Sequence, residues 1–113
     1  MAINTGSETQ EIFLNTLDVE EFVDFVKGDV VANVTSMARG LGAHAATLLT
    51  VSEKPSQQAT EYCRARGTIV CLGLSPKVHI SAEVFSTGSY VGNRLDTKEA
   101  IDFFARCLTK APL

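Results

Sequence analysis

Residues 45–72, AATLLTVSEKPSQQATEYCRARGTIVCL, decide the predicted fold of this chain. They begin with a continuous apolar run at 45–51, which is typical of a strand buried on both faces. Ser52 then caps a helical pattern that Gly67 is expected to end, and a second apolar strand follows at 68–72. A strand, a helix and a strand in so short a stretch predict a parallel crossover unit.

Short strands and helices are expected on both sides of this unit. The patterns indicate strands at 2–4 and 21–25, helices at 7–14 and 29–39, a strand or irregular segment at 78–85, a short strand at 89–91, and a helix at 96–109. Capping boxes at 7–10 and 96–99 mark two of the helix starts. The prediction is an α/β protein with one domain over residues 1–113, in which helices flank a short parallel sheet.

Length and charge exclude several classes of function. The chain has 113 residues, 45% of them hydrophobic, and a formal net charge of −3. Because no basic stripe accompanies that charge, we expect no nucleic-acid partner. No apolar run approaches the roughly 20 residues of a membrane span, and residues 1–4 do not resemble a secretory signal. Three widely spaced cysteines without a signal peptide predict reduced thiols and a cytoplasmic protein.

Two motifs suggest chemistry, but the sequence favours structural explanations for both. Residues 40–45, GLGAHA, match the spacing of the dinucleotide-binding fingerprint. That fingerprint follows a strand and opens a helix, whereas here a helix precedes and a strand follows, so we interpret it as a helix end and a turn. The second candidate is a metal site formed by Cys63, Cys71, Cys107, His44 and His79. These residues lack the close spacing of zinc ligands, so we interpret the thiols as packing groups.

A ligand site, if the chain has one, is predicted at the carboxyl ends of the two apolar strands, where open α/β sheets bind their ligands. Seven residues lie at those ends: Thr50, Val51, Ser52 and Glu53 from the first strand, and Gly73, Leu74 and Ser75 from the second. The alternative is that Ser52 and Glu53 only cap the helix. An acidic cluster of Glu20, Glu21 and Asp24 is interpreted as exposed surface.

Several collinear strings resemble the zinc-containing, yeast-type alcohol dehydrogenases of the medium-chain family. The clearest are residues 88–94, GSYVGNR, and 102–106, DFFAR, with 51–53, VSE, and 62–65, YCRA, upstream. The resemblance covers nearly the whole chain. It implies part of a Rossmann-like cofactor-binding domain from a family that oxidises alcohols with NAD or NADP and a catalytic zinc.

The resemblance also implies which positions contact the cofactor. Asn4 stands where the family has an acidic residue for the adenosine ribose. The positions on the nicotinamide side of the cleft are Thr50, Val51, Leu72, Gly73 and Leu74, and Ser89 and Val91 match a segment near the subunit edge and the cofactor. The positions of the zinc ligands and of the glycine-rich phosphate turn have no counterpart in these residues, so no zinc and no catalytic residue are expected. The family also has a sheet strand where this sequence is shortened, between residues 85 and 88, and we expect that strand to be lost.

Three hypotheses follow. The first is a truncated alcohol-dehydrogenase-like domain that is inactive alone and binds a dinucleotide poorly, because the pyrophosphate site normally anchors it. The second is a non-catalytic module that self-associates or binds a partner protein through an exposed sheet edge. The third is a small enzyme that has reused the strand-end cleft for a non-redox reaction on an apolar molecule.

Overall fold

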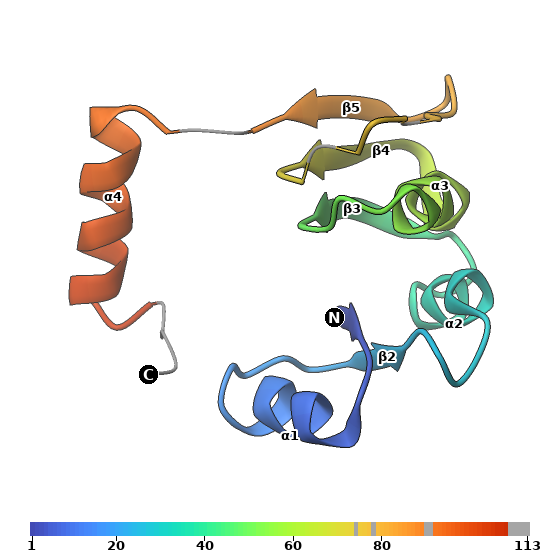
Figure 1. The fold of residues 1–113 in the computed structure, drawn as a ribbon, viewed down its shortest axis with the longest axis horizontal. Helices are drawn as coiled ribbons and strands as arrows, with labels where there is room; N and C mark the ends of the chain where they lie inside the picture. Colours follow the sequence, from blue (N-terminus) through green and yellow to red (C-terminus); the bar gives the residue numbers. More distant parts are fainter. Residues whose placement is uncertain (74, 78, 90–91, 109–113) are drawn as a thin grey trace.

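The computed structural model describes residues 1–73, 75–77, 79–89 and 92–108. Strands and helices alternate along most of the chain (Figure 1). Their order is β1 (Ala2–Asn4), α1 (Ser7–Asn15), β2 (Phe22–Asp24), α2 (Val30–Met37), β3 (Ala43–Leu48), α3 (Glu53–Tyr62), β4 (Cys63–Cys71), β5 (Phe85–Gly88) and α4 (Arg94–Ala105).

The strands form two parallel sheets, so the predicted α/β class with flanking helices is confirmed. In the smaller sheet β1 pairs with β2. In the larger sheet the order is β3-β4-β5, and both pairings are parallel. The crossover from β3 through α3 to β4 is the unit expected from residues 45–72. No helix within the described ranges has the length and apolar character to cross a membrane.

The boundary between α3 and β4 differs from the prediction. The helix ends at Tyr62, and β4 begins at Cys63, which was expected on the helix. The pairing register shifts so that Ala43 faces Cys63 whereas Ala45 faces Thr68. The extra residues of β4 therefore form a bulge, which lengthens the strand without lengthening its partner.

The first apolar run is not buried on both faces, contrary to the prediction. Along β3 only Leu48 is buried, whereas Ala45 and Thr47 are exposed. Successive side chains of a strand point to opposite faces of the sheet, and only the face that carries Ala46 and Leu48 packs against buried apolar side chains. An apolar sequence indicates a strand but does not show whether both of its faces are covered.

A buried apolar cluster holds the two sheets together. It draws side chains from β2, from the neighbouring helices α2 and α3, and from β3 and β4. Its members are Val23, Val30, Val34, Leu48, Ala59, Tyr62, Cys63 and Ile69. Burial in this cluster raises the pKa of the Tyr62 phenol to about 12, because the phenolate would lose its hydration there. The contacts of α2 with β2 and with α3 thus connect sheets that share no hydrogen bonds.

The sequence patterns locate the residues that cap the helices only approximately. Gly6, with φ of 97°, is the N-cap of α1, so the predicted capping box from Ser7 is wrong. A capping box does begin α4, but it joins Asn93 and Asp96, three residues before the predicted one. The Asn93 amide donates to Asp96 Oδ2 over 2.6 Å, and Asn93 Oδ1 accepts from the Leu95 amide over 2.7 Å.

The expected loss of a strand near residue 85 is also wrong. Phe85–Gly88 forms β5, which pairs in parallel with residues 68–71 of β4. Its four residues are all exposed because it is the edge of the sheet. The strand expected at 89–91 lies mostly outside the described residues.

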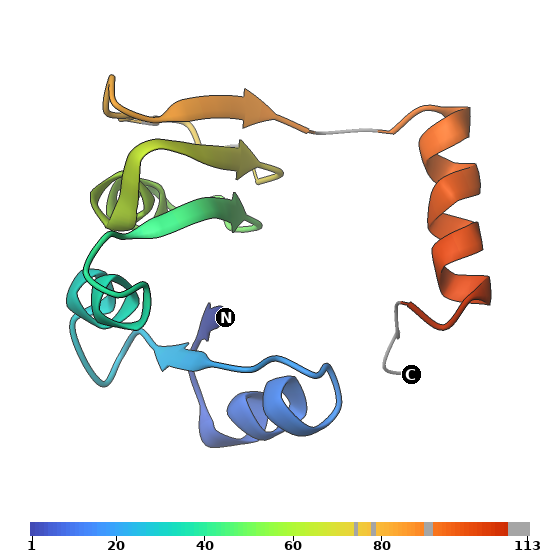
Figure 2. The ribbon, with the colours of Figure 1, turned by 180° about the vertical axis from the view of Figure 1, so that it is seen from behind.

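Helix α4 stands apart from both sheets in two opposite views (Figures 1 and 2). None of its residues is buried. Its apolar side chains Leu95, Ile101 and Phe104 are 60%, 64% and 61% exposed. The helix is therefore stabilised by its own cap and its Arg106–Asp102 ion pair rather than by packing on the core.

The central role of the apolar cluster can be tested with a pair of valines. Val34 is 1% exposed and Val26 is 70% exposed. Val34→Ala should lower the free energy of unfolding by about 2 kcal/mol, because it removes buried methyl groups and leaves a cavity. Val26→Ala should change it by less than about 0.5 kcal/mol. Urea unfolding followed by circular dichroism measures both, and equal effects would contradict the assigned core.

Candidate functional site

The segments that follow β3, β4 and β5 meet where these three parallel strands end. We call this end of the larger sheet the strand-end edge. The Leu48 carbonyl accepts from the amides of Leu72 and Gly73, over 2.9 and 3.0 Å. The Ser89 amide donates to the Cys71 carbonyl over 3.0 Å. Parallel pairing aligns the three strand ends, so residues distant in the sequence become neighbours at the expected place.

Gly73 fits its place only because it has no side chain. A Cβ atom there would overlap the backbone carbonyl group of Thr50. The segments that leave β3 and β4 therefore run in direct backbone contact. The Thr50 hydroxyl accepts from the Ser52 amide over 3.1 Å, which fixes the turn into α3. Ser52 occupies the predicted N-cap position, although its side chain makes no capping bond.

This strand-end edge is apolar and open to solvent. Leu49, Val51 and Leu72 are 77%, 66% and 39% exposed. Ser89 is also exposed, beyond the end of β5. Hydroxyl and backbone groups of Thr50 and Ser89 lie at the same strand ends. Two further predicted contact residues, Leu74 and Val91, lie outside the described residues.

A second, polar group of residues lies at the end of the smaller sheet. Asn4 pairs in register with Asp24, and the Asn4 Oδ1 accepts from the Thr5 amide over 2.9 Å. The Asp24 Oδ1 accepts from the Val26 amide over 3.0 Å, and Lys27 Nζ lies 3.2 Å from Asp24 Oδ2. The hydroxyl of Thr5, the Val26 amide and Lys27 together lower the pKa of Asp24.

Asp24 is therefore a candidate binding residue that the sequence analysis interpreted only as exposed acidic surface. Its position at the end of a strand, three residues before a lysine, was the available signal. Its pairing with Asn4 needed the register between two strands that are not adjacent in sequence.

The glycine-rich segment 40–45 is a turn between α2 and β3, as interpreted. A Cβ at Gly42 would lie 2.6 Å from the Tyr62 carbonyl oxygen, so this glycine packs against another turn rather than facing a phosphate. Among the described residues, no three Cys, His, Asp or Glu side chains are grouped as a metal site requires. Cys63 is buried, and burial raises the pKa of its thiol, whereas Cys107 is exposed and does not serve as a packing group.

Gly73 provides a direct test of the strand-end contact. Gly73→Ala should lower the free energy of unfolding by about 1 to 3 kcal/mol, because the new methyl group must displace the Thr50 backbone. Gly88→Ala is the matched control, since a Cβ there meets nothing within 4 Å. Chemical denaturation compares the two, and an unchanged midpoint for Gly73→Ala would contradict this contact.

Asp24 should make stability depend on pH. Its pKa is lower in the folded chain than in the unfolded one, so its stabilising effect is complete above the unfolded pKa and lost as pH falls through the folded pKa. Asp24→Asn should therefore be less stable than the native chain at pH 7, and the difference should shrink below about pH 4. Thermal unfolding across that range measures this. Glu20→Gln, which removes an exposed carboxylate outside these contacts, should show no such convergence.

Comparison with known proteins gives a partial match to alcohol dehydrogenases. No family model matches it. It is 52% identical to alcohol dehydrogenase 1 of Emericella nidulans and 48% identical to alcohol dehydrogenase 1 of Neurospora crassa. These alignments cover 95% and 96% of this chain, but the chain spans only 33% of the length of either relative.

Solved structures agree in fold. The alcohol dehydrogenase of Aeropyrum pernix superposes with a TM-score of 0.87, at 19% identity, over 98% of this chain and 33% of that one. A quinone oxidoreductase of Pseudomonas syringae gives 0.75 at 17% identity, over 98% of this chain and 39% of that one. The Rossmann-like fold expected from the sequence is thus confirmed. Over nearly all of its residues, this chain is a partial match to the alcohol dehydrogenase family, corresponding to about a third of those proteins.

Proposed function

We propose that these 113 residues form part of a nicotinamide-dinucleotide-binding domain and that, by themselves, they do not oxidise alcohols. The observation that carries the proposal is the meeting of the ends of β3, β4 and β5 at one edge, where Leu72 and Gly73 bond to Leu48 and Ser89 bonds to Cys71. Sequence identity of about half to two alcohol dehydrogenases supports the choice of cofactor. NAD and NADP are both compatible with this proposal.

The strand-end edge suits the nicotinamide half of the cofactor. Val51 and Leu72 offer exposed apolar surface for a flat ring, while Thr50 and Ser89 offer hydroxyl groups beside it. Gly73 lets the backbones of the two strand ends approach closely, so no side chain intrudes between them. The cofactor would supply the hydride acceptor, and the role of these residues is to bind and orient it.

The adenosine half would meet the polar group at the end of the smaller sheet. Asn4 is neutral, so its Oδ1 is a weaker hydrogen-bond acceptor than a carboxylate oxygen. Asp24 beside it has a lowered pKa, so its carboxylate is ionised at neutral pH and can accept strong hydrogen bonds from ribose hydroxyls. We assign to Asp24 the charged-acceptor role that Asn4 cannot fill.

Cofactor anchoring and metal chemistry both favour inactivity of these residues alone. Dinucleotide folds hold the pyrophosphate at a glycine-rich turn that leads into a helix. The glycine-rich turn within the described residues leads into β3 instead. Without that anchor, the strand-end edge and the polar group around Asp24 should bind the dinucleotide weakly. The described residues also present no cluster suited to the zinc that the resemblance implies for the reaction.

A second candidate function is a non-catalytic interaction module. The exposed apolar side chains of α4 and the exposed edge strand β5 favour it, because such surfaces commonly pair with another chain. Self-association or a partner protein would cover them. No described feature favours the third hypothesis, a repurposed non-redox enzyme, and it stays a prediction.

Saturation-transfer NMR with NADH tests the cofactor site. We expect weak binding in which the nicotinamide protons receive saturation from the protein. Val51→Glu, at the strand-end edge, should abolish the transfer. Leu95→Glu, at a similarly exposed apolar residue of α4, should preserve it. Equal transfer to nicotinamide in both variants would refute the location.

A separate assay tests whether these residues oxidise alcohols by themselves. The purified chain, given ethanol, NAD or NADP, and zinc, should show no alcohol-dependent absorbance change from reduced cofactor. Turnover above the protein-free rate would overturn the proposed inactivity while leaving the cofactor site intact. Concentration-dependent sedimentation would favour the interaction module, whereas a monomer at all concentrations would oppose it.

A further inference from the structure

The two parallel sheets are separated by a break between β1 and β3. Each of these strands is hydrogen-bonded on one side only, β1 to β2 and β3 to β4. Two opposite views place β1 between β2 and β3, and none of the described elements lies between β1 and β3 (Figures 1 and 2). The free edges of the two sheets therefore border this break, which we call the sheet break.

The free edge of β3 carries backbone groups that β4 does not use. The Leu48 carbonyl accepts from the Leu72 amide over 2.9 Å, so the backbone groups of Leu48 point toward β4. Alternate residues of a strand direct their amide and carbonyl groups to opposite sides, so those of Ala45 and Thr47 point to the sheet break. An edge strand presents such groups as a template for another strand.

On the other side of the sheet break, β1 offers one residue in the same way. The Ala2 amide donates to the Glu21 carbonyl over 2.8 Å, and this bond lies on the side of β2. The Asn4 carbonyl accepts from the Phe25 amide over 3.1 Å, on the same side. Ile3 lies between these two residues of β1, so its amide and carbonyl groups point to the sheet break.

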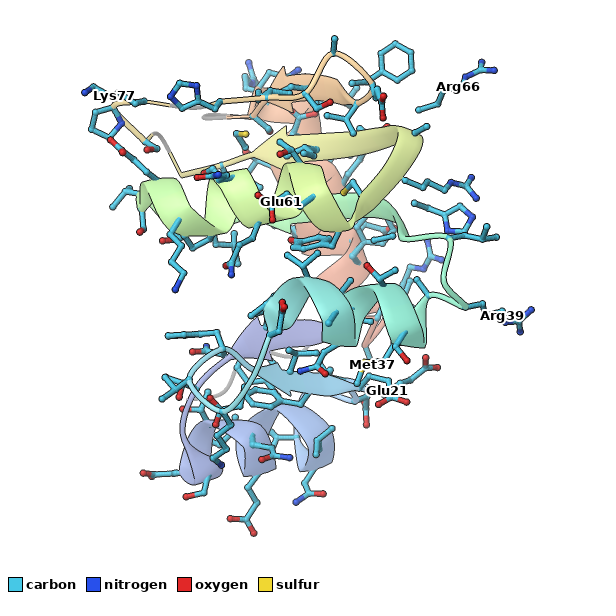
Figure 3. The ribbon with its side chains drawn as sticks, turned by 90° about the vertical axis from the view of Figure 1, so that its right-hand side faces the viewer. Glu21, Met37, Arg39, Glu61, Arg66 and Lys77 are labelled. Carbon is cyan, nitrogen blue, oxygen red and sulfur yellow. The ribbon has the colours of Figure 1, made fainter. Side chains whose placement is uncertain are left out.

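A continuous layer of helices spans the sheet break on one face. Helix α2 packs against β2 and against α3, and α3 packs against β3 and β4. Figure 3 shows the two helices one above the other along this face. Val23 from β2 and Leu48 from β3 are buried in the same apolar cluster with side chains of these helices. A strand in the sheet break would therefore have an apolar layer beside it.

The strand order indicates that the sheet break corresponds to the position of one parallel strand. Doubly wound dinucleotide folds have the order 3-2-1-4-5-6. In the Rossmann-like fold of this chain, β2 and β1 take positions 3 and 2, and β3, β4 and β5 take positions 4, 5 and 6. Position 1 falls between β1 and β3, and none of the described strands occupies it.

An occupant of the sheet break must be an extended segment with both of its edges free. Each of the strands β1 to β5 already pairs with a neighbour. A second folded copy of this chain therefore cannot supply the segment, because its strands have at least one edge in use. Inner strands of parallel sheets are rich in valine and isoleucine, since both of their faces are buried.

We propose that the sheet break accepts an apolar, valine- and isoleucine-rich strand from a separate polypeptide. The backbone of that strand would bond to Thr47 on one side and to Ile3 on the other, and would join the two sheets into one. Addition of an extended segment to free sheet edges is an established mode of peptide recognition, in which main-chain hydrogen bonds supply the affinity. The proposal does not depend on the cofactor site, so either assignment can stand without the other.

Amide hydrogen exchange followed by NMR tests the proposal at single residues. The probe is a synthetic peptide of about five alternating valines and isoleucines between terminal lysines. At a peptide concentration about ten times its Kd, exchange at Ile3, Ala45 and Thr47 should slow about tenfold. The Ser86 amide is the control, because it points to the outer edge of β5, which the peptide should not contact.

Two proline variants test the same contact by affinity, measured by fluorescence anisotropy of the labelled peptide. Thr47→Pro removes an amide that faces the sheet break and should weaken binding about tenfold. Ser86→Pro is the matched control on the other free edge and should preserve the affinity. Both variants should fold, as circular dichroism will show, because proline is tolerated where the amide of an edge strand faces outward.

Several results would overturn the proposal. One is a peptide that slows exchange at none of the three amides, or at Ser86 instead. Slower exchange on β3 without any change at Ile3 would show addition to one edge only, which contradicts insertion between the sheets. Equal loss of affinity in the two proline variants would also overturn it. If Thr47→Pro does not fold, the exchange measurement on the native chain decides by itself.

Discussion

The structure depends on the packing of α2 and α3 against strands of both sheets. Neither sheet is hydrogen-bonded to the other, and the smaller one has strands of only three residues. Val23 from β2, Val34 from α2 and Ile69 from β4 are nevertheless buried in the same apolar cluster. Burial of this kind is the main favourable term in folding, and here it also sets how the two sheets sit relative to each other.

That packing determines where chemistry can occur. Because α3 returns the chain across the sheet, β3 and β4 run in parallel and their carboxyl ends coincide. The contact of Gly73 with the Thr50 backbone then brings the two exits together. The amino-terminal ends of the same strands coincide for the same reason, and there the buried glycines 42 and 67 allow two turns to pack against each other.

The buried core leaves several apolar surfaces uncovered, and these could bind either a cofactor or another protein. The apolar side chains of α4 and the strand β5 remain exposed, which is unfavourable for an isolated molecule in water. The strand-end edge is exposed as well, and a bound ring would cover part of it. The relatives that match this chain are about three times longer, so corresponding surfaces in those proteins have additional polypeptide available to cover them.

The sequence by itself determined the α/β class, the crossover of residues 45–72 and the likeness to alcohol dehydrogenases, because periodicity, turn residues and matching strings are local properties. It also indicated Thr50 and Gly73 from the expected strand ends, whereas Leu72 and Ser89 came from the resemblance alone. Only the tertiary structure decided that β3 is an edge strand, that β4 begins at Cys63, that β5 exists, and that Asp24 lies beside Asn4. These features depend on which strands become neighbours and in what register, and pairing between distant segments leaves little trace in either segment alone.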